Sequence, residues 1–430
     1  VTLTHDFLPS RACPDATFLQ PPAPEGLKWS EVATPDALDM LITARNHDLK
    51  QAVARQAVAE DWVYALVSLQ TCDGYGGGAG GYQGIARMNG GYSSRPLLGL
   101  TRACGEDVSI DPSQWWVRDV KRLLTTRKRG EDRGIGAPSE SALLWILDWQ
   151  EGEPLDLRHL DPWFIEICRR VRLSEVDSRL TAWRATSKGP RVDAKMYKGN
   201  IGDPWTPIHS DGRSLTLGET GEFDYRRLCE LLFSGNWNRP LLACPDEDET
   251  GDMLLVAEAF ARGGSKTGGF KSRVVPVPGR VVPLLASDTV GSLAEAQMEE
   301  IKNFDAALRD ALALIAVRRS GKSIEKKHYR YAASARKRFD RTVDRLFFPS
   351  LWHRTNVATG SGDQVYQAKL TFLRDLMNAA ETEFELALPA MPCPALLRPR
   401  AEARARRAFR NSIWRSFPEV FDREHTVEAA

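Results

Sequence analysis

The stretch SLAEAQMEEIKNFDAALRDALALI, Ser292–Ile315, decides the fold of the last third of the chain. Its apolar side chains recur every three or four positions, at Ile301, Phe304, Leu308, Leu312 and Ile315. This spacing matches the period of a helix and places these side chains on one stripe. Ser292 is followed three residues later by Glu295, a capping-box pattern, so we expect the helix to begin at Ser292.

Similar stripes recur further along the chain and predict further amphipathic helices. One consists of Tyr331, Ala335, Phe339, Val343 and Leu346, and the next of Tyr366, Leu370, Leu373, Met377 and Phe384. A fourth helix is predicted from about Glu402 to Trp414. Four such helices with loops between them are typical of an antiparallel bundle, so residues 289–430 are predicted to form a C-terminal four-helix bundle.

Residues 1–288 have a different pattern, in which short strands, helices and loops follow one another without regular strand–helix alternation. We therefore expect an irregular, mixed α+β globular domain here, which makes the whole chain an α+β protein. A helix is predicted to start at Thr34, and another to end near Ala261. The clearest strand is Val274–Val277, which resumes at Val281 beyond a Pro-Gly turn; its prolines suggest a sheet edge.

The overall composition is that of a globular protein, with 42% hydrophobic residues and a net charge of +1. This net charge neither indicates nor excludes nucleic acid, because the charges gather in local clusters. The seven cysteines are scattered and never in a C-x-x-C spacing, which favours reduced thiols over disulfides or a cysteine zinc site. No apolar run approaches the roughly 20 residues that span a bilayer. We expect a soluble, cytoplasmic protein that has no membrane partner.

A glycine-dense segment runs from Gly74 to Gly91, after a predicted helix. Glycine allows the backbone to come close to a ligand and to adopt positive φ, and exposed amides then donate to phosphates or base edges. Tyr82, Gln83 and Arg87 among the glycines favour a ligand-binding loop, with a flexible surface loop as the alternative. A dinucleotide fingerprint fits poorly, because the glycines follow a helix rather than a strand.

A second glycine-flanked segment, RGGSKTGGFKSR at Arg262–Arg273, is strongly basic. Its Lys-Thr pair suggests a phosphate-binding loop, but the spacing G-x-x-x-x-G-K-[ST] is not met. A positively charged tip suited to a DNA backbone or groove remains, and a solvated turn is the alternative.

Little in the sequence suggests catalysis. His47-Asp48 is a dipeptide that a metal-dependent phosphohydrolase would need together with further His and Asp ligands. The seven histidines never sit four residues apart or beside a cysteine, and no G-x-S-x-G motif occurs. We therefore expect no catalytic residues, no metal site and no cofactor.

Two of the predicted bundle helices are rich in basic residues. The second carries Lys326, Lys327, Arg330, Arg336, Lys337, Arg338, Arg341 and Arg345, and the fourth carries Arg398, Arg400, Arg404, Arg406, Arg407 and Arg410. Helical spacing places Arg400, Arg404 and Arg407 on one face. Basic helical faces bind nucleic acid by neutralising phosphates, although a charge run is usually only a solvated face.

These pieces, in this order, resemble the CasA-type large subunit of type I-E CRISPR Cascade over most of the chain. The matching stretches are Arg45-Asn46-His47-Asp48, the glycine run that ends in NGGYSSR at Asn89–Arg95, GDPWTP at Gly202–Pro207, the Arg262–Arg273 loop and the C-terminal bundle. The resemblance implies a non-catalytic subunit that recognises the PAM in double-stranded DNA and starts duplex opening, so that the guide RNA can pair.

The resemblance also implies roles for particular residues. Carried over by position, the glycine loop at the PAM would contain Gly78, Gly80, Gly81, Tyr82, Gln83 and Arg87. Ser265, Lys266 and Thr267 would form a wedge beneath the PAM pair, in a loop whose Lys271 and Arg273 add positive charge. Asn46, His47 and Asp48 would lie near the guide RNA and the PAM. Contacts to the DNA backbone are predicted at Arg336, Lys337, Arg400, Arg404 and Arg407.

The partners that the resemblance implies are target duplex DNA, a CRISPR guide RNA, the other Cascade subunits and a recruited helicase-nuclease. Readout of the PAM from the minor groove would be loose, because that groove mainly distinguishes A·T from G·C pairs. Two other functions remain open at this stage. One is a metal-dependent phosphohydrolase or nuclease built on His47-Asp48, and the other is a structural scaffold subunit that never touches DNA.

Overall fold

The computed structural model describes residues 16–38, 57–72, 96–105, 109–130, 135–138, 140–165, 167, 169–176, 179–186, 191–192, 195–218, 220–246, 248–262, 267–285, 287–317 and 324–421. The chain divides into two compact units. The first comprises Val1–Phe223 and Glu230–Pro276, and the second comprises Asp224–Cys229 and Val277–Ala430.

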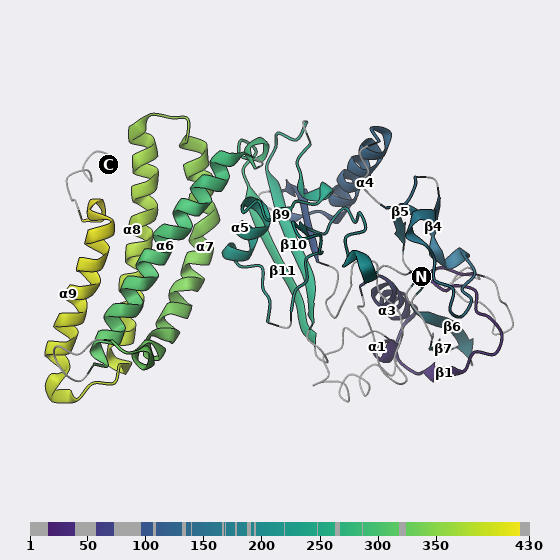
Figure 1. Ribbon diagram of the computed structural model, residues 1–430, viewed down its shortest axis with the longest axis horizontal. Coiled ribbons are helices and arrows are strands. Elements are labelled where there is room, and N and C mark those ends of the chain that lie inside the picture. The colour runs from purple at the N-terminus through teal and green to yellow at the C-terminus, as the bar shows by residue number, and fades with distance from the viewer. Residues whose placement is uncertain are drawn as a thin grey trace. The chain divides into compact units, whose positions relative to one another are not determined.

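A four-stranded sheet in the order β11-β10-β2-β3 is the part of the first unit that matters most for the site. Its strands are β2 (Leu97–Cys104), β3 (Ser109–Ile110), β10 (Met253–Arg262) and β11 (Thr267–Val277). β10 and β2 are antiparallel, with Met253 opposite Arg102 and Glu258 opposite Leu97. β10 and β11 form a long hairpin (Figure 1), and β11 lies at the sheet edge, as its prolines predicted.

Strand β10 shows that the predicted helix ending near Ala261 is wrong. Met253–Arg262 is an inner strand of the sheet, and the side chains from Met253 to Ala257 are at most 1% exposed. A strand covered on both faces has a continuous apolar run, which sequence periodicity cannot separate from a buried helix. The basic segment therefore runs from the end of one strand, β10, into the neighbouring strand β11. The predicted resumption of the next strand at Val281 is also wrong, because Val282–Leu284 forms a 3₁₀ turn.

The remaining strands of the first unit form three smaller sheets. β1 (Trp29–Val32), β7 (Arg179–Ala185) and β6 (Arg170–Val176) pair in the order β1-β7-β6; β4 (Ser141–Leu143) pairs with β5 (Leu160–Ile165), and β8 (Ile208–His209) with β9 (Trp237–Asn238). Helices α1 (Pro35–Leu38) and α3 (Ala59–Cys72) contribute Leu38, Trp62 and Leu66 to a core cluster that also contains Val171 and Leu173 of β6. α5 (Tyr225–Phe233) is the last helix before β9.

Helix α4 (Pro112–Lys128) follows β3 directly and begins with a strong local signal. Asp111 has an extended backbone, and its carboxylate accepts hydrogen bonds from the amides of Ser113 and Gln114. Pro112 occupies the first helical position, where no backbone donor is needed. This cap fixes where α4 starts, and therefore which of its side chains face the sheet.

The second unit contains four long helices in contact, as the sequence predicted. They are α6 (Asp288–Ile315), α7 (Ala333–Val357), α8 (Gly362–Ala387) and α9 (Arg398–Ser416), and they run side by side in Figure 1. The predicted start of α6 at Ser292 is wrong by one turn, because Ser287 has the extended backbone of a cap residue and the helix already runs from Asp288. Ser361 and Gln364 form the reciprocal capping box at the start of α8.

The interior of this bundle is apolar and aromatic. The predicted stripe from Ile301 to Ile315 is buried along α6. The stripes on α7 and α8 are buried too, apart from the half-buried Leu346 and the exposed Tyr366, while Tyr331 lies in a 3₁₀ segment before α7 and is exposed. Phe384 of α8 stacks on Phe409 of α9 with ring centroids 4.9 Å apart. No helix in the described part of the chain is long and apolar enough to cross a membrane.

Candidate nucleic-acid interface

Two glycine-rich segments adjoin the same end of the four-stranded sheet. The chain enters β2 at Leu97, after the glycine-dense segment, and Leu97 lies opposite Glu258 of β10. β10 continues from there to Arg262, and β11 returns from Thr267. Since β2 and β10 are antiparallel, the start of one strand and the end of the other meet at one end of the sheet. The sheet therefore brings together the points from which both segments leave.

Most of the predicted DNA-reading residues belong to the segments themselves and lie outside the described residues. These are Gly78, Gly80, Gly81, Tyr82, Gln83, Arg87, Ser265 and Lys266. The predicted guide-RNA loop, Asn46, His47 and Asp48, lies outside them too. Thr267 is placed as the first residue of β11, but its side chain is not among those described. Their roles stay predictions.

The exit of the glycine-dense segment is held by the GDPWTP motif. The amide of Leu98 donates to the Trp205 carbonyl at 2.9 Å, and the hydroxyl of Thr206 donates to the Pro96 carbonyl at 2.7 Å. Asp203 fixes this motif by accepting from the Trp205 amide at 2.8 Å. Pro96 and Leu98, which follow the glycine-dense segment in the sequence, are thus bonded to a motif more than 100 residues away.

The two basic residues of strand β11 lie on the partly buried face of the strand. Lys271 and Arg273 alternate with Phe270 and Val274, so the two basic side chains share the face that further along contains the buried Val275. The Lys271 ammonium lies 3.7 Å from the Glu222 carboxylate, and Arg273 is half-buried. The two side chains that were predicted to contact DNA are therefore both half-buried, and the carboxylate of Glu222 already balances the charge of Lys271.

The opposite face of β11 carries an exposed aromatic residue that the sequence reasoning did not select. Phe270 is 54% exposed and follows Gly269, whose φ of +85° requires glycine. On the same face, Ser272 donates to Glu258 of β10 at 3.1 Å. Burial raises the pKa of the Glu258 carboxyl, and the bond from Ser272 lowers it by less. The signal for Phe270 was an aromatic residue in an otherwise small and basic loop.

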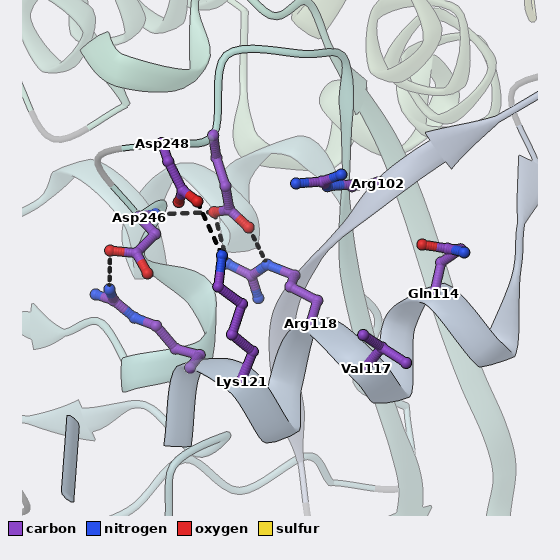
Figure 2. A pocket seen from close by; sticks show the side chains of 9 residues that line it. Arg102, Gln114, Val117, Arg118, Lys121, Asp246 and Asp248 are labelled. Atoms are coloured by element: carbon purple, nitrogen blue, oxygen red, sulfur yellow. Dashed lines mark hydrogen bonds and ion pairs between the residues drawn. The ribbon is translucent and has the colours of Figure 1, made fainter. Parts of the chain in front are cut away.

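A charged cavity of about 230 Å³ lies between α4 and the acidic loop that precedes β10. Figure 2 shows Lys121 reaching from α4 towards Asp248, with Asp246 beside it. Lys121 pairs with Asp248 at 2.8 Å, and Arg122 pairs with Asp246 at 2.6 Å. The cations on this wall of α4 are therefore neutralised within the chain, which argues against a site for an anionic ligand.

Arg118 forms the floor of this cavity and is fully engaged. Its guanidinium donates to both oxygens of Glu249, at 2.7 and 3.1 Å, and to the carbonyls of Leu100, Leu242 and Cys244. The side chains of Arg118 and Glu249 are only 6% and 5% exposed. The cavity is thus the outer surface of a structural ion pair, and the inner side of that pair touches β2.

The basic residues predicted on the helical unit separate into two groups. Arg336 donates to Asp305 of α6 at 2.7 Å, and Arg404 donates to the carbonyl of Leu314 at 2.6 Å, at the end of α6. These two side chains already bind other helices of the unit. Lys337, Arg400 and Arg407 are exposed and form no hydrogen bond or ion pair with the described residues.

Metal-ligating groups do not gather in the described residues: no cluster of three or more His, Cys, Asp or Glu side chains occurs there. Cys104, Cys229, Cys244 and Cys393 are free thiols. Burial raises the pKa of the Cys229 thiol far above its ordinary value, so this cysteine is unreactive.

Comparison with known proteins identifies the fold. No protein-family model matches this sequence, and no curated protein matches it at a significant level. Solved structures do match. The structure of Thermus thermophilus CasA (Cse1) has a TM-score of 0.56 and 15% identity, covering 94% of this chain and 79% of that chain. Thermobifida fusca Cse1 has a TM-score of 0.59 and 14% identity, covering 95% and 80%.

Cse1 from Acidimicrobium ferrooxidans has a TM-score of 0.53 at 14% identity and covers 94% of this chain and 80% of its own. These likenesses confirm the predicted resemblance at the level of the fold: the chain is folded like CasA and Cse1. At such low identity, they assign no residue a role.

Proposed function

We propose that this chain is the large subunit of a type I-E Cascade-like CRISPR complex, in which it recognises the PAM in duplex DNA and starts strand separation. The observation that carries the proposal is the arrangement of the β11-β10-β2-β3 sheet. The start of β2, which follows the glycine-dense segment, and the end of β10, which precedes the basic segment, lie at one end of the sheet in a CasA-like fold. Two turns that leave from one place can approach one duplex site together.

The chemistry of the two segments supports this function. Reading the minor groove requires backbone near the base edges, which glycine permits, and opening a base step costs a few kcal/mol of unstacking. Phosphate contacts offset that cost, and the exposed Lys337, Arg400 and Arg407 of the helical unit are suited to supply them. The PAM preference should therefore be loose and strongly dependent on salt.

Cleavage would be delegated to a recruited helicase-nuclease, as the sequence resemblance implies. The remaining proposed partners are a guide RNA and the other Cascade subunits, in the cytoplasm. Base pairing between the guide RNA and the target strand would recognise the target sequence, while the protein would recognise the PAM and the shape of the duplex.

The first test is co-purification of the tagged full-length chain from cells that carry its CRISPR locus. The proposal expects a guide RNA and several repeated backbone subunits. The purified complex is then bound to duplexes with randomised bases beside the target. Selective binding of a few flanking sequences is the expected result. Recovery of the chain alone, or a complex that binds all flanking sequences equally, contradicts the proposal.

Two lysine variants make the second test specific to the hairpin. Lys266→Ala in the hairpin turn should weaken duplex binding and reduce the slope of log affinity against log salt by about 0.9 for each phosphate that the lysine no longer neutralises. Lys302→Ala is the matched control, since Lys302 is an exposed lysine on α6 that pairs with Glu299. Equal effects of both substitutions would exclude the hairpin from DNA binding and favour a scaffold role.

A further inference from the structure

We propose that helix α4 positions the glycine-dense segment, with Asp119 and Trp205 as the positioning residues that set where this segment leaves β2. The inference rests on the proposed function and adds to it a helix that was not among the predicted DNA-contacting residues. In this proposal the GDPWTP motif, which carried part of the sequence resemblance, fixes the start of β2.

The connection runs through side chains at the inner face of α4. The Trp205 indole donates from Nε1 to Asp119 Oδ2 at 3.1 Å, while the Trp205 carbonyl accepts from the Leu98 amide at 2.9 Å. One residue thus joins α4 to the second residue of β2. The Asp119 carboxylate also accepts from the neighbouring Arg118 at 3.3 Å, and Arg118 in turn donates to the Leu100 carbonyl at 2.8 Å.

These bonds hold a stretch of β2 for which strand β3 supplies no partner. β3 pairs with Ala103 and Cys104, at the opposite end of β2 from the glycine-dense segment. At the end next to that segment, the backbone groups of Leu98 and Leu100 bind Trp205 and Arg118. The bond to Leu98 is made by the backbone carbonyl of Trp205, and the place of this residue is fixed by its indole, which is bonded to Asp119 of α4. The bond to Leu100 is made by the Arg118 side chain. The direction of the emerging chain therefore depends on Trp205 and α4.

The carboxyl of Asp119 is suited to act as an anchor for this contact. It lies on the buried side of α4, and burial raises its pKa, while the hydrogen bond from Trp205 lowers it by a smaller amount. A buried carboxylate holds its donors firmly, because each unmade bond is expensive in a low-dielectric interior. The indole can thus hold one orientation.

Trp205→Phe in the complete complex tests the inference, because it keeps the aromatic ring and removes only the Nε1 donor. Trp183→Phe is the matched control. Trp183 is also half-buried in the first unit and donates one indole hydrogen bond, to Ser174, but it belongs to the β1-β7-β6 sheet. The measurement is the ratio of the affinities for duplexes with and without the preferred flanking sequence, together with the melting temperature.

We expect Trp205→Phe to reduce this ratio about tenfold, the effect of one misdirected charge-assisted hydrogen bond, while affinity for the duplex without the preferred sequence stays unchanged. Trp183→Phe should leave the ratio intact even where it lowers the melting temperature. A merely structural role of Trp205 predicts the reverse: a lower melting temperature with the ratio preserved. That outcome overturns the inference.

A second variant covers the case in which Trp205→Phe destabilises the complex. Thr206→Val removes the hydroxyl that donates to the Pro96 carbonyl and keeps the side-chain shape, so it should lower the same ratio. Hydrogen exchange of the β2 amides, measured without DNA, should accelerate near Leu98 in either variant. A parent complex that does not discriminate flanking sequences refutes the proposed function itself. A parent that discriminates, with unchanged ratios in both variants, refutes only the positioning role.

Discussion

The buried ion pair between Arg118 and Glu249 offers a sharp test of how the first unit is held together. Replacing Arg118 by Met keeps most of the side-chain volume and removes every donor of the guanidinium. Glu249 then retains the Asp246 amide, at 2.8 Å, as its remaining described donor, and it stays inside the protein as an unpaired charge. The Leu100 carbonyl on β2 loses a donor at 2.8 Å.

The magnitude follows from these losses. Breaking a buried ion pair by removing one partner costs about 3–5 kcal/mol, because the remaining charge is uncompensated. Glu249 lines the adjoining cavity, where water can solvate its carboxylate, so we expect the cost not to exceed this range. The double variant Arg118→Met/Glu249→Met removes both charges and should recover about half of the loss, since the carbonyls of Leu100 and Leu242 still lack their donor.

Hydrogen exchange is the suitable assay, because a chain of two units need not unfold in a single step. In Arg118→Met, the amides of β2 and β10 should exchange about a hundredfold faster or more, which corresponds to the lower end of the energy range. Arg354→Met is the matched control: Arg354 pairs with Glu300 at 2.7 Å and is equally buried, but lies in the helical unit. It should accelerate exchange in α6 and α7 and leave β2 unchanged.

The reasoning is refuted if β2 exchanges less than about tenfold faster in Arg118→Met. It is also refuted if the double variant is less stable than the single one, because the single variant alone leaves a buried charge unpaired.

Three further predictions concern single contacts. Phe409→Ala removes the ring stacked on Phe384, both at most 2% exposed, and should destabilise the helical unit by about 3–5 kcal/mol in thermal unfolding. Burial raises the pKa of Glu258 above its ordinary 4.5, so the folded protein binds this proton more tightly than the unfolded chain does. The protein should therefore lose stability as the pH rises from 4.5 to the raised pKa of Glu258. The melting temperature of Glu258→Gln should decline less over the same pH range. Arg406→Ala, which removes an exposed pair with Glu385, should change stability by less than about 1 kcal/mol in denaturant titration.

The bundle could be predicted from sequence because its information is local. Residues from Ile301 to Ile315 repeat at helical spacing, and one apolar stripe can be buried only against other helices. The start of α6 was predicted wrongly for an equally local reason. Ser292 and Glu295 match a capping pattern, yet such patterns also occur inside helices, and the extended backbone that makes Ser287 the cap is invisible in the sequence.

The contacts around β2 could not be predicted, because they join residues far apart in the chain. Arg118 and Glu249 are 131 positions apart, and Trp205 lies 86 positions from Asp119. Arginine in a helix ordinarily indicates an exposed face, so nothing local marks Arg118 as buried. For Trp205, the motif GDPWTP carried the family resemblance, but nothing in it names Asp119 or Leu98 as partners.

The topology of the sheet constrains how the two glycine-rich segments can act. Because β2 and β10 are antiparallel neighbours, the entry to β2 and the exit from β10 meet at one sheet end whatever the sequences of the two segments are. Changes within the segments can therefore alter what they bind without separating them. The start of β2 has a further constraint, since the Trp205 carbonyl accepts from the Leu98 amide and the Trp205 indole donates to Asp119 of α4. If the proposed positioning role holds, substitutions at Asp119 of α4 should change the selectivity for the flanking sequence while the pairing of β2 with β10 persists.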